Sequence, residues 1–289
     1  MKTNVLYYGD NLEILRKYIP DNSIDLIYLD PPFNSKKDYN ILFKENGGVE
    51  SEAQIKAFTD TWHWTQTAEN TYHDIVTNGP LKVGQLIGAL HDAIGQNDVM
   101  AYLVMMTTRL IELHRVLKPT GSLYLHCDPT ASHYLKLVLD QVFGPANFQN
   151  EIVWYYQGAG VSPKRFGRRH DTIFLYTKSL KWAFYPDEVR TPYAEATVER
   201  FRHYIGNIRS GKDFGTQQLN PKGKHPDDVW EISIVAPSAK ERLGYPTQKP
   251  LALLERIIKA SSNEGDVVLD PFCGCGTALV AAQKLNRRW

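Results

Sequence analysis

Asp30, Pro31, Pro32 and Phe33 form a segment whose residue types suit the binding of a polar, planar group. The Asp30 carboxylate can accept hydrogen bonds, and it follows an apolar run at the place where open α/β sheets bind ligands. Pro31 and Pro32 lack backbone N–H donors and stiffen the turn, so backbone carbonyls stay free to accept hydrogen bonds. Phe33 adds a ring suited to stacking on a planar base. Taken alone, the segment is equally well explained as an ordinary turn.

A second segment, residues 270–277 (DPFCGCGT), places a glycine-rich turn between an apolar run and a helical pattern. Such a turn allows the backbone to approach a nucleoside closely. By itself it is a weak signal, because it can serve any nucleotide or simply reverse the chain. Two such segments in one chain, each at a predicted strand end, are far more specific than either alone.

Alternating strand and helix patterns predict the scaffold that must position these segments. The expected strands are residues 5–8, 24–29, 122–125, 152–156, 172–176 and 267–269. The expected helices are residues 11–18, 99–117, 134–142, 277–285 and one opened by Pro250. The stretch 34–98 is too long for a simple loop and predicts one or two helices of its own. The alternation predicts an α/β sheet with helices on both faces.

The net charge of +1 conceals an uneven distribution. Residues 157–225 contain thirteen basic and six acidic side chains, which gives this segment +7 and leaves −6 for the rest of the chain. A basic segment on a mildly acidic body is typical of a polyanion-binding surface. A solvated face rich in lysine and arginine explains the charge equally well.

Composition narrows the class of protein. Hydrophobic residues at 43% and charged residues at 22% are ordinary for a globular chain. The sequence contains no run of about 18 apolar residues, so it predicts no membrane span. The N-terminus does not have the pattern of a signal peptide. The cysteines Cys127, Cys273 and Cys275 give no disulfide framework, which suits a reducing cytosol, and their spacing predicts no metal site. His126 and His170 lack ligand spacing or a paired nucleophile, so we expect structural hydrogen bonds from them.

The two segments resemble the catalytic and cofactor-binding motifs of the amino-methyltransferases of DNA, which modify adenine or cytosine at an exocyclic nitrogen. Their order, with the catalytic segment first and the glycine turn last, resembles the β-type permutation of that family. Further matching segments are residues 8–10 (YGD), 122–128 (SLYLHCD), 170–178 (HDTIFLYTK) and 245–250 (YPTQKP). The likeness covers most of the chain, and the motifs are highly specific in combination.

The resemblance implies S-adenosylmethionine as the cofactor, S-adenosylhomocysteine as its product, and no metal. It implies catalytic roles for Asp30, Pro31, Pro32 and Phe33. It implies cofactor binding by Asp10, Asp30, Thr247, Gln248, Lys249, Pro250, Asp270, Pro271, Phe272, Gly274, Gly276 and Thr277. In the implied mechanism, the Asp30 carboxylate and the Pro31 carbonyl accept hydrogen bonds from the target amine, and Phe33 stacks on the flipped base. Aspartate at position 30 favours adenine over cytosine.

The resemblance also implies a circularly permuted, Rossmann-like fold with a target-recognition insertion. Residues 1–178 would form the catalytic half with an insertion at about 34–98, residues 179–243 the target-recognition region, and residues 244–289 the cofactor-binding part. Trp62, His63 and Trp64 in the first insertion are expected to pack a core more than to contact DNA. The implied partner is double-stranded DNA in a bacterial, archaeal or phage-encoded cytoplasmic enzyme, without a membrane. A homodimer and a restriction subunit are left open.

The C-terminus departs from the family pattern. A nucleotide-binding unit is expected to carry an acid about 20 residues after its glycines, on a further strand. Here 13 residues follow Gly276. We therefore expect the last strand to be lacking and cofactor affinity to be weakened relative to an extended version.

Four alternatives stay open at this point. They are a cytosine-N4 methyltransferase, an RNA methyltransferase, a DNA-binding fragment with impaired catalysis, and a dinucleotide oxidoreductase. The β-type order and the long recognition region favour DNA over RNA. The oxidoreductase is the least favoured, because no second βαβ half follows the glycine turn.

Overall fold

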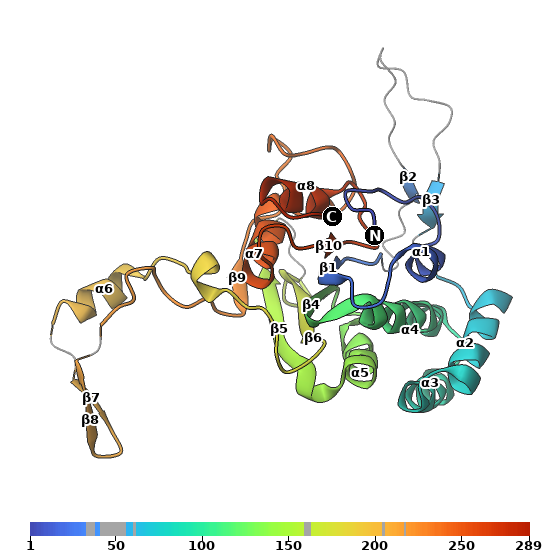
Figure 1. The fold of residues 1–289 in the computed structure, drawn as a ribbon, viewed down its shortest axis with the longest axis horizontal. Helices are drawn as coiled ribbons and strands as arrows, with labels where there is room; N and C mark the ends of the chain where they lie inside the picture. The colour runs from blue at the N-terminus through green and yellow to red at the C-terminus, as the bar shows by residue number, and fades with distance from the viewer. Residues whose placement is uncertain (33–37, 41–55, 60–61, 159–162, 204–205, 217) are drawn as a thin grey trace, which may run out of the picture.

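A six-stranded sheet lies at the centre of the computed structural model (Figure 1). The structure describes residues 1–32, 38–40, 56–59, 62–158, 163–203, 206–216 and 218–289. In spatial order the strands are β10 (Val268–Leu269), β1 (Ile24–Leu29), β4 (Leu117–Cys127), β6 (His170–Thr177), β5 (Phe148–Tyr155) and β9 (Val229–Glu231). β10, β1 and β4 are mutually parallel, whereas β6 is antiparallel to both β4 and β5. Five of the six predicted strands are therefore confirmed.

Helices cover both faces of this sheet, and β1 shows why (Figure 1). Its side chains alternate between two cores, because successive residues of a strand point to opposite faces. Leu26 and Tyr28 pack beneath α7 (Leu251–Ser261) and α8 (Thr277–Lys284). Ile27 and Leu29 pack on the other face, with α1 (Asn11–Tyr18), α4 (Asp98–Val116) and α5 (Ser132–Phe143). A continuous apolar run is typical of a strand buried on both sides, so the predicted α/β sheet with helices on both faces is confirmed.

The first insertion contains two helices, as expected. These are α2 (Gln66–Asn78) and α3 (Leu81–Ile94), which lie beside α4 and α5 at one end of the molecule (Figure 1). Trp62 and Trp64 both pack against the core on this face, which confirms the prediction of a core role for these two rings. The short strands β2 (Asp38–Asn40) and β3 (Lys56–Thr59) form a separate antiparallel pair. No helix in the described part of the chain is long and apolar enough to cross a membrane.

The expected strand at residues 5–8 is wrong. The segment is irregular and pairs with none of the described strands. Leu6 and Tyr8 are each 68% exposed, and the Tyr7 ring stacks on Tyr18 of α1 with centroids 5.1 Å apart. This apolar segment therefore packs against α1 instead of joining the sheet.

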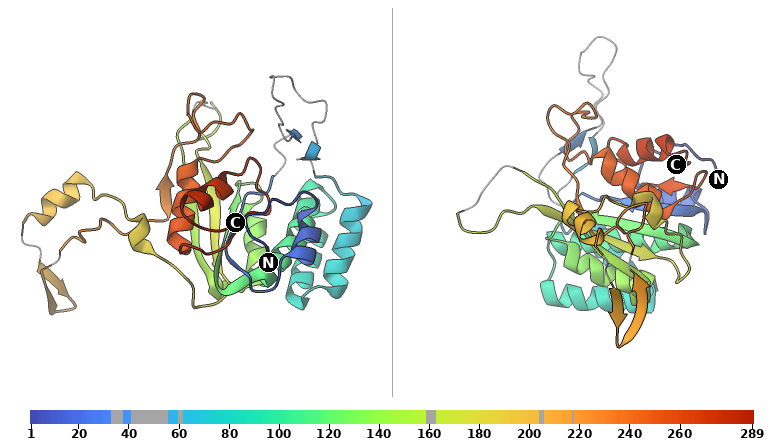
Figure 2. Two further views of the ribbon diagram at one scale, coloured as in Figure 1. Left: turned by 45° about the horizontal axis from the view of Figure 1, so that its top comes forward. Right: turned by 90° about the vertical axis from the view of Figure 1, so that its left-hand side faces the viewer.

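An arm extends from the body between β6 and β9 (Figures 1 and 2). It contains a short 3-10 turn (Pro186–Val189), α6 (Glu195–Phe201) and a hairpin of β7 (Gly206–Arg209) and β8 (Lys212–Thr216). A backbone bridge between Thr191 and Lys224 closes its base. The arm falls within the predicted region 179–243, whose boundaries stay a prediction.

After α8 the chain returns to the edge of the sheet. Arg288 forms a parallel bridge with Val267, and Val268 N donates to the Arg288 carbonyl at 2.8 Å. The backbone N–H of Trp289 donates to the side chain of Asn4 at 2.9 Å, so the two ends of the chain lie together. The expectations about a further strand and about cofactor affinity stay predictions.

Candidate active site

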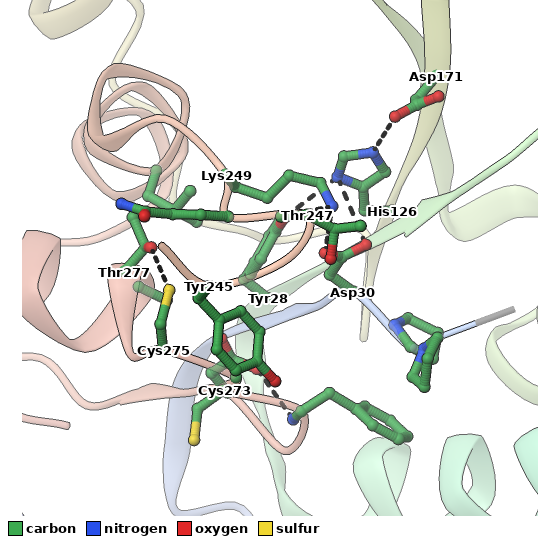
Figure 3. A pocket seen from close by; sticks show the side chains of 18 of the residues that line it. Tyr28, Asp30, His126, Asp171, Tyr245, Thr247, Lys249, Cys273, Cys275 and Thr277 are labelled. Carbon is green, nitrogen blue, oxygen red and sulfur yellow. Dashed lines mark hydrogen bonds and ion pairs between the residues drawn. The ribbon is translucent and has the colours of Figure 1, made fainter. Parts of the chain in front are cut away.

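A pocket opens where three parallel strands end, as expected for ligands of open α/β sheets (Figure 3). Asp30 follows β1, Asp128 follows β4 and Asp270 follows β10. Asp171 comes from the start of β6, which runs in the opposite direction and therefore begins at this edge. Because β10 pairs in parallel with β1, the two predicted segments from opposite ends of the sequence line one pocket.

Asp30 lies at the centre of this pocket and pairs with Lys249. The Asp30 side chain is 27% exposed and the Lys249 side chain 15%, and Nζ of Lys249 donates to Oδ2 of Asp30. Burial weakens the screening of such a pair by water. The described lining contains four carboxylates, those of Asp30, Asp128, Asp171 and Asp270, against the single lysine. The pocket therefore has an excess of acidic groups.

Pro31 and Pro32 line the pocket beside Asp30, and Trp62 supports their turn. The catalytic roles of Pro31 and Pro32 stay a prediction. The indole Nε1 of Trp62 donates to the Pro32 carbonyl at 3.1 Å, and its ring lies 5.9 Å from that of Tyr102 on α4. The turn is thereby tied to the helical layer. Phe33 lies outside the described residues, so its predicted stacking role stays a prediction.

Like Tyr28 and Asp171, His126 lines the pocket although it is not among the predicted site residues. Its side chain is 2% exposed and both ring nitrogens face polar groups (Figure 3). Nε2 donates to Oδ2 of Asp171 at 3.1 Å, Nδ1 lies 3.1 Å from the Tyr28 hydroxyl, and Oδ1 of Asp30 is 3.9 Å from Nδ1. Tyr156 donates to the other oxygen of Asp171 at 3.1 Å. These are structural hydrogen bonds, as expected, but they lie directly behind Asp30.

The protonation states of Asp171 and Tyr28 depend on burial and on the groups beside them. Burial alone would raise the pKa of Asp171, but the hydrogen bond and charge of His126 hold it below its ordinary value. Burial, followed by the neighbouring Asp30, raises the pKa of Tyr28 well above its usual range. Tyr28 therefore stays a neutral hydroxyl and Asp171 a carboxylate around neutral pH.

The glycine turn after β10 brings backbone close to the pocket. Gly274 has φ +50°, and a Cβ there would lie 3.2 Å from the Tyr245 ring. A side chain at this position would strain the backbone and push against that ring. Gly276 has φ +82° and precedes the first turn of α8. The pocket is lined by Phe272, Gly274 and Thr277. Gly276 does not line it, but its positive φ shapes the turn that leads into α8.

Asp270 is a buried carboxyl whose pKa is strongly raised. Burial, with a further contribution from the charge of Asp30, raises its pKa to about 7, although Phe272 N donates to Oδ1 at 3.0 Å. A carboxyl with a raised pKa is partly protonated at neutral pH.

The raised pKa of Asp270 predicts a pH dependence of stability. The folded protein holds a proton that the unfolded chain releases near pH 4, so this contribution is complete below pH 4 and is lost as the pH rises through about 7. We expect the wild type to lose about 3 kcal/mol relative to Asp270→Asn between pH 5 and pH 8.5. Thermal melts of both proteins across this range measure the difference. A constant difference would contradict a raised pKa.

Part of the pocket wall is formed by Tyr245, Thr247, Gln248 and Lys249. Thr247 has φ +59°, and Thr247, Gln248 and Lys249 all line the cavity. The Gln248 side chain accepts a hydrogen bond from Leu243 N at 2.8 Å and donates to the Glu241 carbonyl at 2.7 Å. It thereby fixes the loop that carries Lys249. Pro250 is the N-cap of α7 and lies outside the lining.

Asp10 and Pro271 lie beside a second cavity instead. Asp10 caps α1 through Leu12 N at 2.8 Å and pairs with Arg109 at 2.8 Å. It is absent from the described lining of both cavities. Asn11, which does line the second cavity, donates to the Pro271 carbonyl at 2.9 Å. Asp270 lines both cavities, so the second one adjoins the first.

In the described part of the chain, no cluster of three or more histidine, cysteine or acidic side chains could hold a metal ion. Cys273 lines the pocket, and burial raises the pKa of its thiol to about 12. The nearby Sγ of Cys275 lies 3.4 Å from the Thr277 hydroxyl. A thiol with such a pKa is a poor nucleophile at neutral pH.

Comparison with known proteins identifies what the chain is similar to. A family model described as DNA methylase matches residues 24–289. Type II methyltransferase M.HpaI of Haemophilus parainfluenzae is 37% identical over 221 residues, which are 76% of this chain and 63% of that protein. DNA adenine methyltransferase YhdJ of Escherichia coli (strain K12) is 29% identical, over 100% of this chain and 77% of that protein. The chain thus spans less than two thirds of the length of M.HpaI.

A solved structure shares the fold. PvuII DNA methyltransferase, described as cytosine-N4-specific, superposes with a TM-score of 0.59 over 100% of this chain and 81% of that chain, at 16% identity. At this identity the similarity concerns the architecture of the sheet and its helices. It supports the predicted Rossmann-like class for the sheet described above.

Proposed function

The chain belongs to the DNA methylase family, and from this membership we propose that it transfers a methyl group from S-adenosylmethionine to the exocyclic amine of adenine in double-stranded DNA. One observation carries the proposal. The Asp30 segment and the glycine turn of residues 270–277 line a single acidic pocket. A hydrogen-bond acceptor for an amine and a cradle for a nucleoside are thus adjacent.

The pocket fits a cationic nucleoside cofactor. Three carboxylates and the partly protonated Asp270 against one lysine favour a positively charged ligand. The turn at Gly274 leaves no room for a side chain beside Tyr245. Thr247, Gln248 and Lys249 would hold the methionine end, and residues 270–277 would hold the nucleoside. When bound, the cofactor supplies an electrophilic methyl group on a sulfonium sulfur.

The chain's own residues would orient the amine. The Asp30 carboxylate and the Pro31 carbonyl would each accept one amine hydrogen, which draws the nitrogen towards sp³ geometry and aims its lone pair at the methyl group. Orientation of this kind supplies a large part of the rate in displacement reactions. Lys249 now occupies Oδ2 of Asp30, so it would share that carboxylate with the amine or give way to it. The base must be unstacked first, which costs a few kcal/mol.

The Trp62 hydrogen bond yields a prediction for this turn. Trp62→Phe keeps a ring against Tyr102 but removes the donor to the Pro32 carbonyl. We expect single-turnover methyl transfer to fall about threefold to tenfold, as for the loss of one hydrogen bond. The measurement is the rate at saturating DNA and cofactor, with Trp64→Phe as the matched control. Equal rates for the two variants would refute the supporting role of Trp62.

Adenine is proposed as the target base on two grounds. The first is the acid at position 30, which the resemblance associates with adenine. The second is the similarity over the whole chain to a protein described as a DNA adenine methyltransferase. Cytosine-N4 methylation is the second candidate, favoured by the structural similarity to the PvuII enzyme.

We propose that the arm within residues 179–243 recognises the target sequence, with the body formed by residues 1–178 and 244–289. Its extended shape supports this role (Figure 2). So does the net charge of +7 over residues 157–225, a range that overlaps the arm. Contacts from lysine and arginine to phosphates would give affinity, and contacts to base edges would give specificity. A second copy of the chain and a restriction subunit are further candidate partners.

The identity of the methylated nucleoside tests the proposal. Plasmid DNA would be incubated with the protein and deuterated S-adenosylmethionine, digested to nucleosides and separated by mass spectrometry. Labelled N6-methyldeoxyadenosine supports the proposal, and labelled N4-methyldeoxycytidine supports the second candidate. DNA binding without any labelled nucleoside would identify a DNA-binding chain with impaired catalysis.

A further inference from the structure

The loop between β5 and β6 carries an aromatic side chain that is almost fully exposed. Phe166 is 98% exposed, more than any other large hydrophobic residue in the described part of the chain. Single exposed apolar residues are common on protein surfaces and need no explanation by themselves. Phe166 differs because its surroundings and its place in the fold both point to a ligand.

The surroundings are strongly basic. Residues 157–169 contain four basic side chains and no acidic one. The basic residues are Lys164, Arg165, Arg168 and Arg169. Lys164, Arg165 and Arg168 are exposed on either side of Phe166. An apolar ring surrounded by cations suits a polyanion whose interior is aromatic, which is the chemistry of a nucleic-acid duplex.

The base of this loop is anchored to the active-site network. Tyr156 N donates to the Arg169 carbonyl at 2.9 Å, and the Tyr156 hydroxyl donates to Asp171 at 3.1 Å. The Arg169 guanidinium also lies against Gly167 and Gly158, since a Cβ on them would lie 3.4 Å and 3.7 Å from it. The two ends of the loop are thus held together beside the pocket.

The position of the loop relates Phe166 to the target base. Asp171 lines the pocket and Phe166 precedes it by five residues, so at most about 18 Å of chain separates them. The loop joins the end of β5 to the start of β6, and the strand directions place this connection at the edge of the sheet where β1 ends before Asp30. A duplex that delivered a base to Asp30 would therefore pass close to Phe166.

We propose that Phe166 inserts into the DNA stack at the base step vacated by the flipped target, while Lys164, Arg165 and Arg168 bind the flanking phosphates. The inference rests on the proposed function, because it assumes that a base enters the pocket. Stacking of an aromatic side chain on the neighbouring bases is favourable, so it offsets part of the cost of unstacking the target base. Phe166 would thus favour the extruded state of the base and take no part in methyl transfer itself.

The test compares a paired target with one that is already unpaired. The target sequence would be read from genomic DNA methylated by the wild type, and two duplexes would be made, one fully paired and one with an abasic site opposite the target base. On the paired duplex we expect Phe166→Ala to lose about tenfold or more in kcat/KM, as expected for one base–aromatic stack. On the abasic duplex the loss should shrink to about threefold or less.

Matched variants separate this role from others. Phe166→Trp should retain most of the activity, and Leu81→Ala, at a residue 76% exposed on α3, should behave as wild type. Phe166→Ala should leave the salt dependence of DNA binding unchanged, whereas neutralising Arg165 or Arg168 should lower its slope by about one. Equal losses on both duplexes, or no loss on the paired one, would overturn the proposal.

A fluorescence measurement tests the insertion of residue 166 independently of methyl transfer. The difference spectrum between Phe166→Trp and the wild type should be quenched when duplex DNA is added, since a stacked indole loses emission. Quenching without any methylation would support DNA insertion and reject the proposed enzyme activity. An unchanged difference spectrum in a variant that binds DNA would reject the insertion of residue 166, whatever the activity.

Discussion

Asp30→Asn is expected to slow methyl transfer by roughly a hundredfold to a thousandfold, the loss found when one preorganised polar group is removed from an active site. The variant keeps the volume of the side chain but replaces an acceptor oxygen with an amide that donates. It retains one oxygen that can accept an amine hydrogen but loses the negative charge, so it binds and polarises the amine less strongly. The pairing with Lys249 is weakened at the same time.

Single-turnover transfer of a radiolabelled methyl group to DNA measures this effect, together with the affinity for DNA. Asp74→Asn, at an exposed position on α2, is the matched control and should leave both quantities unchanged. The affinity of Asp30→Asn for DNA should stay within about threefold of wild type, because phosphate contacts dominate it. A normal transfer rate in Asp30→Asn would exclude this carboxylate from the reaction.

His126→Ala is expected to destabilise the fold by about 3 kcal/mol. The substitution leaves the partly buried Asp171 without its imidazole partner and removes the group that faces the Tyr28 hydroxyl. A charge that loses its partner in such a site is costly, more so than the loss of a neutral contact. The melting temperature should fall by roughly 5 °C or more.

The double variant His126→Ala/Asp171→Asn tests the cause of this loss. Because it removes the unpaired charge as well, it should recover part of the stability lost by His126→Ala alone. His133→Ala, at an exposed position on α5, should change the melting temperature little. If the double variant were no more stable than His126→Ala, the unpaired carboxylate would not explain the effect.

The positions of Asp30 and Asp270 could be predicted because local patterns determine them. The run before each acid is continuous and apolar, so each acid falls at the end of a buried strand. Parallel strands place their carboxyl ends at one edge, so two such segments meet even when they lie at opposite ends of the sequence. The same reasoning fails for residues 5–8, an apolar run that does not join the sheet and whose Tyr7 ring stacks on Tyr18 of α1.

The contacts of His126 and Lys249 could not be predicted in this way. His126 meets Asp171 because β4 and β6 are antiparallel neighbours, and the register that pairs them is a property of the whole sheet. Lys249 reaches Asp30 from a loop held by Gln248, which the sequence pattern does not position. Asp10 was assigned to cofactor binding by resemblance alone, and its pairing with Arg109 depends on how α1 packs against α4.

The most direct test of the central claim is methylation of unmodified genomic DNA by the wild type and by Asp30→Ala, read by long-read sequencing. The proposed chemistry predicts modified adenines at one recurring sequence after treatment with wild type, and none above background with Asp30→Ala. Equal modification by both proteins would contradict the assignment of Asp30 as the acceptor for the target amine.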